Sequence, residues 1–314
     1  MSRGRIPIVL DCDPGHDDAL AILLAAASPA LELVAITTVA GNQTLEKTTL
    51  NARRVCTVAG IGGIPIAAGS DRPLIRSQVV AGDIHGESGL DGPSFAAPSV
   101  ELDARHAVEV IMDAAAARPG ELCLVAVGPL TNVAAALRRD PGLAGRLRRI
   151  AIMGGAINIG NTTPAAEFNI YADAEAARVV FESGVPITMV PLETTHRAVA
   201  DEAVIARIAM LDTPVANLSV ELLRFFAKTY ERVFGFGAPP VHDPCAVVAI
   251  AAPAVLMTRP MHVAIETRGE HTYGRTVCDV HGVTNQPPNA DVAVDLDVAA
   301  FWDLMIGALR TYPA

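Results

Sequence analysis

Four aspartates fall within eight positions near the N-terminus: Asp11, Asp13, Asp17 and Asp18. Two like charges 4 Å apart repel by roughly 4 kcal/mol at an effective dielectric constant near 20. A helix N-terminus stabilises one acid by only about 0.3–1 kcal/mol, so it does not neutralise this set. Carboxylate oxygens are the ligands that hard divalent cations prefer. The spacing therefore favours a metal site, and the alternative is a solvated acidic turn that caps a helix.

The residues around these acids predict the elements that must hold them. Residues 6–10 form a short, apolar, β-branched run, which predicts a buried strand. Pro14 and Gly15 mark a turn, and the apolar residues 19–27 predict a helix. The acids are thus expected on the loop that leaves the carboxyl end of a strand. Open α/β sheets bind their ligands at that end.

Strand and helix patterns alternate through most of the chain. Further strands are predicted at residues 31–39, 64–68, 122–127, 149–153 and 187–192, and the longest helices at 44–59, 104–117, 174–183, 214–234 and 299–309. Repeated strand–helix units predict an α/β fold with an open, mainly parallel, twisted, Rossmann-like sheet and helices on both faces. Late strands at 263–266, 276–280 and 292–296 predict a small antiparallel addition near the C-terminus. A single domain over residues 1–314 is expected.

Composition and charge narrow the class of protein. The chain has 314 residues, of which 51% are hydrophobic, and a formal net charge of −10. This acidity argues against nucleic acid or an anionic membrane as a partner. The five cysteines are widely spaced and odd in number, which fits the reducing cytoplasm better than a disulfide framework. No run is long and apolar enough for a signal peptide or a membrane span.

Further polar residues follow other predicted strands. Because the loops at successive strand ends converge on one crevice, we expect these side chains to lie together. Asp13, Asp18 and Asp243 are plausible carboxylate ligands for calcium, and magnesium stays open as the alternative. A zinc site is not expected, since no histidines or cysteines have zinc spacing. The polar residues at strand ends are Asn42, Thr131, Asn161, Glu167, Asn169, His242 and Asp243.

Seven sequence blocks span nearly the whole chain: residues 11–19 (DCDPGHDDA), 37–43 (TTVAGNQ), 85–89 (HGESG), 128–132 (GPLTN), 153–155 (MGG), 166–169 (AEFN) and 242–246 (HDPCA). Taken together, these blocks resemble the nucleoside hydrolase family, the inosine–uridine type N-ribohydrolases. The resemblance implies hydrolysis of the N-glycosidic bond between ribose and a base, with a tightly held calcium ion and a small-molecule ribonucleoside as substrate. It also implies a homotetramer or homodimer.

The resemblance also implies a role for each matching residue. Asp13 would be the general base that activates the attacking water, and His242 would donate a proton to the leaving base. A histidine that only bonds beside a metal ligand is the alternative for His242. Asp11 matches a supporting acid behind the metal. The implied calcium ligands are Asp13, Asp18, the backbone carbonyl of Thr131, and Asp243; the implied ribose-binding residues are Asp17, Asn42, Asn161, Glu167 and Asn169.

The choice of base is expected to depend on less regular parts of the chain. Residues 69–100 have no clear period and hold His85, so they predict a functional loop or lid that faces the base. Tyr230, Phe234 and Phe236 are candidates to stack on the base. His16 and the run Gly89–Pro93 resemble the pyrimidine-preferring branch, and Asp83 stands where some members have histidine. Uridine and cytidine are therefore expected, with a broad or purine (inosine) preference as the alternative.

Two other classes of protein compete for the first loop. An Asp-x-Asp motif at a strand end also marks haloacid-dehalogenase-type phosphatases, which use the first aspartate as nucleophile. Those enzymes expect Thr or Val two residues after the second aspartate, where this chain has Gly15. A calcium-dependent ribose-binding protein is the non-enzymatic alternative. The absence of an export signal and the presence of Asp13 as a base argue against it.

Overall fold

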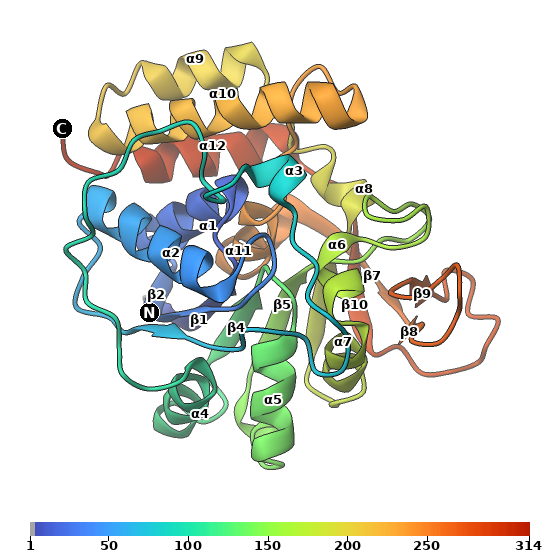
Figure 1. The fold of residues 1–314 in the computed structure, drawn as a ribbon. Helices are drawn as coiled ribbons and strands as arrows, with labels where there is room; N and C mark the ends of the chain where they lie inside the picture. The colour runs from blue at the N-terminus through green and yellow to red at the C-terminus, as the bar shows by residue number, and fades with distance from the viewer. Residues whose placement is uncertain (1–3) are drawn as a thin grey trace.

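The centre of the molecule is one twisted eight-stranded sheet (Figure 1). It is seen in a computed structural model that describes residues 4–314. Neighbouring strands are parallel except for the last pair, which is antiparallel. The predicted fold class is confirmed. In spatial order the strands are β3 (Ile66–Ala68), β2 (Leu31–Thr38), β1 (Ile6–Cys12), β4 (Cys123–Ala126), β5 (Arg149–Met153), β6 (Ile187–Val190), β10 (Ala290–Leu296) and β7 (Leu256–Met261).

Helices cover both faces of the sheet and create two apolar cores. The central strands are buried on both faces, which explains their continuous apolar sequences. The first core packs under α1 (His16–Ala27), α2 (Leu45–Ala59), α9 (Glu202–Ala209), α10 (Pro214–Phe234), α11 (Pro244–Ala251) and α12 (Val298–Leu309). The second packs under α4 (Ala107–Ala117), α5 (Thr131–Arg139) and α7 (Ala174–Phe181).

Strand order reverses at β1, which lies between β2 and β4. Loops that leave β1 and β4 therefore diverge to opposite faces and open a crevice at their carboxyl ends. Asp13 follows β1 at this crevice. Gly41 after β2 and Gly128 after β4 lie so close to it that a Cβ on either would overlap the Asp13 carboxylate. Three loops thus close around one aspartate.

The C-terminal strands differ in part from the sequence prediction. β8 (Val263–Ile265) and β9 (Thr276–Cys278) form the small antiparallel sheet that was expected. β10 instead joins the main sheet, parallel to β6, and β7 was not predicted. β7 contains Arg259 and Pro260, which are exposed and atypical of an inner strand, but an edge strand tolerates both. No helix within residues 4–314 has the length and apolar character needed to cross a membrane.

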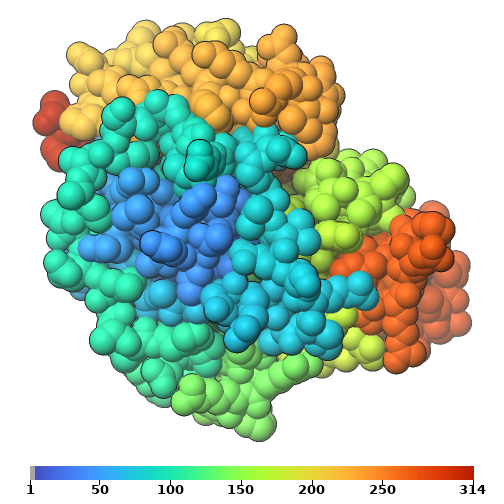
Figure 2. All heavy atoms as spheres, in the orientation of Figure 1, coloured from blue at the N-terminus to red at the C-terminus, as the bar shows by residue number. Residues whose placement is uncertain are grey.

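The segment between β3 and α4 is mostly irregular, as its lack of period predicted. It contains one short helix, α3 (Gly82–His85), which packs against α10. In the space-filling view this segment, in cyan to green, runs over the surface between the lower helices and α10 (Figure 2). Two other short helices, α6 (Phe168–Ala172) and α8 (Leu192–Thr195), follow β5 and β6 at the same end of the sheet.

Candidate active site

The first loop and the N-terminus of α11 bring a cluster of buried carboxylates together. Asp17, Asp18 and Asp243 each offer an oxygen within 4.8 Å of the others. Asp13 contacts the Asp18 carboxyl group and is also fully buried. The predicted carboxylate ligands were Asp13, Asp18 and Asp243. In the structure the three carboxylates that lie closest together are Asp17, Asp18 and Asp243, and Asp13 lies beside them. The acids near the N-terminus thus meet Asp243, as predicted, but Asp243 does not follow a strand as expected: it comes after α10 and is the N-cap of α11, while Asp17 and Asp18 lie in the first turn of α1.

The chain supplies only part of the hydrogen bonding that these acids need. Asp18 accepts the backbone N–H of Asp13 at 3.0 Å and that of Gly15 at 2.9 Å. One oxygen of Asp13 accepts the N–H of Asn42 at 2.7 Å, and Oδ1 of Asp13 is buried without a partner among the described residues. A buried, unpaired carboxylate oxygen beside three other acids fits a cation, because only positive charge offsets both desolvation and repulsion.

Burial is the main cause of the perturbed acidity of this cluster. It raises the pKa of Asp13, Asp18 and Asp243, and the charges of neighbouring carboxylates raise the pKa of Asp13 and Asp243 further. Burial also raises the pKa of Asp17 to about 7 and that of Asp11 to about 6. A bound cation favours the ionised form of each acid and reverses these shifts. The oxygen-only donor set suits a hard ion such as calcium or magnesium.

Asp11 lies behind the cluster and is held by polar side chains. Its Oδ1 accepts hydrogen bonds from Thr37 Oγ1 at 2.6 Å and from Asn132 Nδ2 at 2.8 Å. Asn132 also donates to the carbonyl of Thr38 at 3.0 Å and accepts the N–H of Ser70 at 2.8 Å. Asn132 therefore ties the loops after β2, β3 and β4 to the acid below the site.

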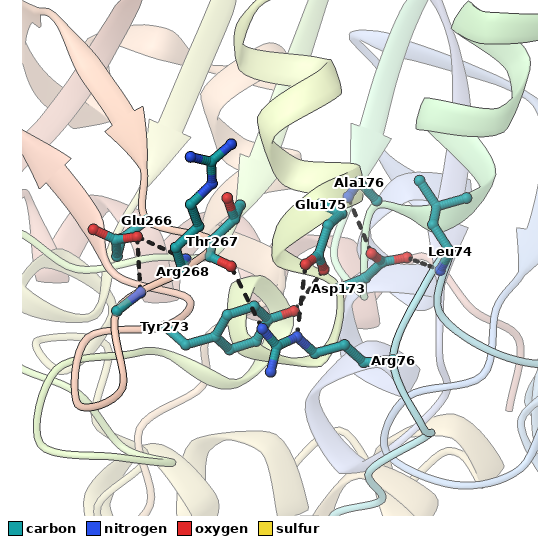
Figure 3. A network of polar contacts seen from close by, with 10 residues as sticks. Leu74, Arg76, Asp173, Glu175, Ala176, Glu266, Thr267, Arg268 and Tyr273 are labelled. Atoms are coloured by element: carbon teal, nitrogen blue, oxygen red, sulfur yellow. Dashed lines mark hydrogen bonds and ion pairs between the residues drawn. The ribbon is translucent and has the colours of Figure 1, made fainter.

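Thr131 and the start of the irregular segment share one acceptor. Thr131 is the first residue of α5, and its Oγ1 donates to Asp173 Oδ2 at 2.7 Å. The same oxygen accepts the N–H of Leu74 at 2.9 Å. Nearby, Arg76 stacks over the Tyr273 ring at 3.6 Å, while Tyr273 donates to Glu175 at 2.6 Å (Figure 3). These contacts anchor residues 74–76 to α7, just before the segment turns toward the site.

A cavity of about 260 Å³ opens above the acids. Its wall contains every residue predicted to bind ribose: Asp17, Asn42, Asn161, Glu167 and Asn169. Glu167 caps α6 by accepting the N–H groups of Asn169 and Ile170, and burial raises its pKa to about 7. Asn169 Nδ2 donates to the carbonyls of Val127 at 2.8 Å and Met153 at 3.1 Å. The structure thus brings these polar side chains together over one surface.

A hydrogen-bonded chain of three side chains forms another part of the site. His242 Nδ1 lies 2.7 Å from Thr195 Oγ1, and its Nε2 lies 2.8 Å from the hydroxyl of Tyr230. Burial and the nearby His196 lower the pKa of His242 to about 3. His242 is therefore neutral, with one ring nitrogen as donor and the other as acceptor. Tyr230 and His242 both line the cavity.

Other base-contact candidates are divided between the cavity and the layer behind it. His85, Asp83 and Phe234 line the cavity, whereas Phe236 packs on His196 and Tyr230 outside it. His16 lies behind His85: its ring nitrogens bond to Nδ1 of His85 at 3.1 Å and to the carbonyl of Asp91 at 2.9 Å. Burial lowers the pKa of His16 to about 4, so its ring is a neutral spacer.

Several supporting residues were not singled out from the sequence. Thr195, Asp173 and Glu193 bond to partners that are 34 or more residues away, and most of those partners are backbone groups. No local spacing marks such contacts. For Asn132 a signal existed, since it ends the block of residues 128–132, directly after the predicted ligand Thr131.

Comparison with known proteins agrees with this geometry. A family model described as inosine-uridine preferring nucleoside hydrolase matches residues 8–303. The chain is 45% identical over 305 residues to the pyrimidine-specific ribonucleoside hydrolase RihB of Escherichia coli (strain K12), and the match covers 97% of each chain. A RihB sequence from Shigella sonnei matches with the same identity and coverage.

Solved structures with different substrate preferences share the fold. A purine-preferring ribonucleoside hydrolase from Gardnerella vaginalis has a TM-score of 0.91 at 30% identity, covering 97% of this chain and 98% of that one. The plant nucleoside hydrolase PpNRh1 has a TM-score of 0.89 at 30% identity, covering 98% and 99%. The chain therefore belongs to the inosine-uridine preferring nucleoside hydrolase family and is an N-glycosyl hydrolase.

Proposed function

We propose that the protein hydrolyses ribonucleosides to free base and ribose with the help of calcium, and that it prefers the pyrimidine nucleosides uridine and cytidine. The observation that carries this proposal is the cavity itself. Its lining includes Asp17 and Asp243 of the buried carboxylate cluster, and Asp13, with its unpaired Oδ1, lies beside that cluster just outside the lining. The lining also carries Asn42, Asn161, Glu167 and Asn169, which suit sugar hydroxyls, and a hydrogen-bonded tyrosine and histidine that suit a leaving base.

Calcium would be held by Asp13, Asp18, Asp243 and the backbone carbonyl of Thr131. Asp17, which lies within 4.8 Å of Asp18 and Asp243, would join them or bind a ribose hydroxyl. When bound, the cation supplies positive charge that orients sugar hydroxyls and makes a nearby water more acidic. Its oxygen-only surroundings favour calcium or magnesium over zinc, and the number of available oxygens favours calcium.

Asp13 acts as the general base in this proposal. Its free Oδ1 is the carboxylate oxygen that accepts a proton from the attacking water, while Asn42 holds the other oxygen. A correctly placed base contributes about 10²–10⁴-fold. As the bond to the base breaks, positive charge develops on the ribose, and the surrounding carboxylates stabilise it. Direct attack by water predicts inversion at the anomeric carbon.

The leaving base receives the hydroxyl proton of Tyr230, and the Nε2–H of His242 stabilises the phenolate oxygen left behind until a proton from solvent restores it. When Thr195 donates to Nδ1 of His242, Nε2–H donates to the Tyr230 oxygen, and the phenolic proton is free to point into the cavity. A neutral His242 is suited to this positioning role, because it carries no spare proton of its own. In this proposal His242 acts through Tyr230, which lines the cavity and would contact the base.

The preference for pyrimidines has two supports. RihB, at 45% identity, is named as pyrimidine-specific. His85 lines the cavity and is backed by His16, which is fixed by the carbonyl of Asp91 in the run that resembled the pyrimidine branch. The alternative is a broad or purine preference, since a relative at 30% identity prefers purines.

A panel of nucleosides tests the proposed function directly. Purified protein with calcium is incubated with uridine, cytidine, inosine, adenosine and thymidine, and reducing sugar and free base are measured. Uridine and cytidine are each expected to release base and ribose in equal amounts. Thymidine, which lacks the 2′-hydroxyl, is expected to release little base. Faster release from inosine would overturn the pyrimidine preference, and calcium-dependent binding of ribose without any turnover would favour the ribose-binding protein.

A single domain over residues 1–314, a cytoplasmic location and a homotetramer or homodimer stay predictions.

A further inference from the structure

One carboxylate outside the cavity holds the backbone of a loop that forms part of its wall. Glu193 lies on α8, directly after β6. It accepts the N–H of Ile157 at 3.0 and 2.9 Å, that of Asn158 at 2.6 Å and that of Ile159 at 3.3 Å. Three successive N–H groups that converge on one carboxylate form a concave anion site, and bonds to an ionised acceptor are about twice as strong as neutral ones.

The loop that Glu193 holds leads directly to Asn161. Gly160 has no space for a Cβ, because its position lies against the backbone of Thr163 and Ala166. Asn161 Oδ1 accepts the N–H of Phe168 at 2.9 Å, whereas its Nδ2 makes no hydrogen bond to any residue in the described range. Asn161 lines the cavity, so this amide is available to a ligand there.

The helix that carries Glu193 is itself fixed to the sheet. Thr194 Oγ1 donates to the carbonyl of Ala293 on β10 at 2.8 Å, and the N–H of Leu192 donates to the carbonyl of Gly155 at 3.0 Å. The next residue, Thr195, bonds to His242. The loop held by Glu193 and the His242 side of the cavity are therefore both attached to the same short helix, α8.

We propose that Glu193 is a positioning residue for ribose binding: it fixes residues 157–159 and thereby directs the Asn161 amide toward the sugar. The proposal rests on the proposed function, because it takes a ribonucleoside as the ligand. In Glu193→Gln the amide NH2 that replaces Oε2 faces the N–H of Ile157, and loss of the negative charge weakens the bonds to Oε1, so the hold on the loop loosens. A displacement of about 1 Å in a substrate-positioning group can reduce rates about 10²-fold.

Hydrogen exchange tests the anchor without any substrate. Asn158 and Ile159 are exposed, yet in the wild type the amides of residues 157–159 are expected to exchange at least tenfold more slowly than unprotected amides. In Glu193→Gln this protection is expected to be lost, while the strands stay protected. Wild-type amides that exchange at unprotected rates would show that the anchor does not hold in solution, and would overturn the proposal.

A matched control separates the role in ribose binding from general stability. Asp279 accepts the N–H groups of Val283 and Thr284, both at 2.8 Å, in an exposed loop that does not line the cavity. Asp279→Asn is expected to release that loop and to change kcat/KM for uridine less than twofold. Glu193→Gln is expected to lower kcat/KM about 10–100-fold. An effect of Glu193→Gln no larger than that of Asp279→Asn would contradict the proposal.

A double-variant cycle tests whether Glu193 acts through Asn161. Adding Glu193→Gln to Asn161→Ala is expected to lower kcat/KM by less than about threefold beyond Asn161→Ala alone, since the amide to be positioned is already absent. Multiplication of the two single effects would show that Glu193 acts elsewhere and would overturn the inference. Absence of turnover in the wild type would instead refute the proposed function, and the exchange experiment would still test the anchor.

Discussion

Without a cation in the acid cluster, the folded protein is expected to lose stability as the pH rises. Burial raises the pKa of Asp17 from 3.8 to about 7. Between these values the folded protein holds a proton that the unfolded chain has lost, so the free energy of unfolding falls with rising pH. The full difference corresponds to about 4 kcal/mol, of which more than half falls between pH 5 and pH 8. The raised pKa of Asp13, Asp18 and Asp243 acts in the same direction.

Calcium is expected to oppose this loss, because it binds the ionised carboxylates and competes with protons. At one hundred times its dissociation constant, a cation stabilises the folded state by about 2.7 kcal/mol. Since the site gives up protons on binding, this stabilisation should be larger at pH 8 than at pH 5. Glu167, whose pKa is also about 7, lies outside the closest acid cluster and should leave a smaller residual slope in calcium.

Urea unfolding at pH 5 and pH 8, in a chelator or in millimolar calcium, measures both effects. Stability in chelator is expected to fall from pH 5 to pH 8, and calcium is expected to restore most of the loss. Asp243→Asn should reduce the calcium effect at pH 8, whereas the distant Asp279→Asn should leave it unchanged. A calcium effect that is equal at both pH values, or a stability in chelator that rises with pH, would refute the reasoning.

Three substitutions test other parts of the site. Asp13→Asn is expected to lower kcat on uridine at least about 10²-fold, because it removes the general base; near wild-type turnover would exclude that role. Tyr230→Phe should lower turnover of uridine about 10–100-fold and that of a nitrophenyl riboside, whose leaving group needs no proton, less than threefold. Equal losses on both substrates would contradict proton donation. Asn132→Ala should cost about 1–3 kcal/mol in urea unfolding, because it leaves the buried Asp11 with one partner fewer; an unchanged midpoint would contradict this.

Local pattern predicted the elements that carry the acids. The run from Ile6 and the turn at Pro14 predicted a strand, a turn and a helix from short-range chemistry alone, and β1 and α1 confirm them. Only Asp13 lies on the connecting loop, however, because Asp11 belongs to β1 and Asp17 and Asp18 belong to the first turn of α1. The late strands were harder. β7 contains an arginine and a proline because it lies at the sheet edge, and edge position depends on strand order rather than on local sequence.

The sequence predicted that residues at strand ends meet at one site, but it did not reveal the residues that hold them in place. Parallel strands bring their carboxyl ends to one edge, so Asp13 after β1 and Asn42 after β2 were expected to meet. Asp243 was expected after a strand too, but it follows α10 and reaches the site as the N-cap of α11. Glu193 and Asp173 bind backbone N–H groups, which every residue carries, so no residue type marks their partners in the sequence. The chain from Thr195 through His242 to Tyr230 depends on how α8, α10 and α11 pack together, which is set by the tertiary fold.

The most direct test of the central claim is the product of uridine in buffer without phosphate. Wild-type protein with calcium is expected to release uracil and free ribose in equal amounts, and folded Asp13→Asn protein to release neither at a comparable rate. Ribose 1-phosphate formed only when phosphate is added would indicate a phosphorylase. That product, or the absence of any base release from uridine, cytidine and inosine, would contradict the account.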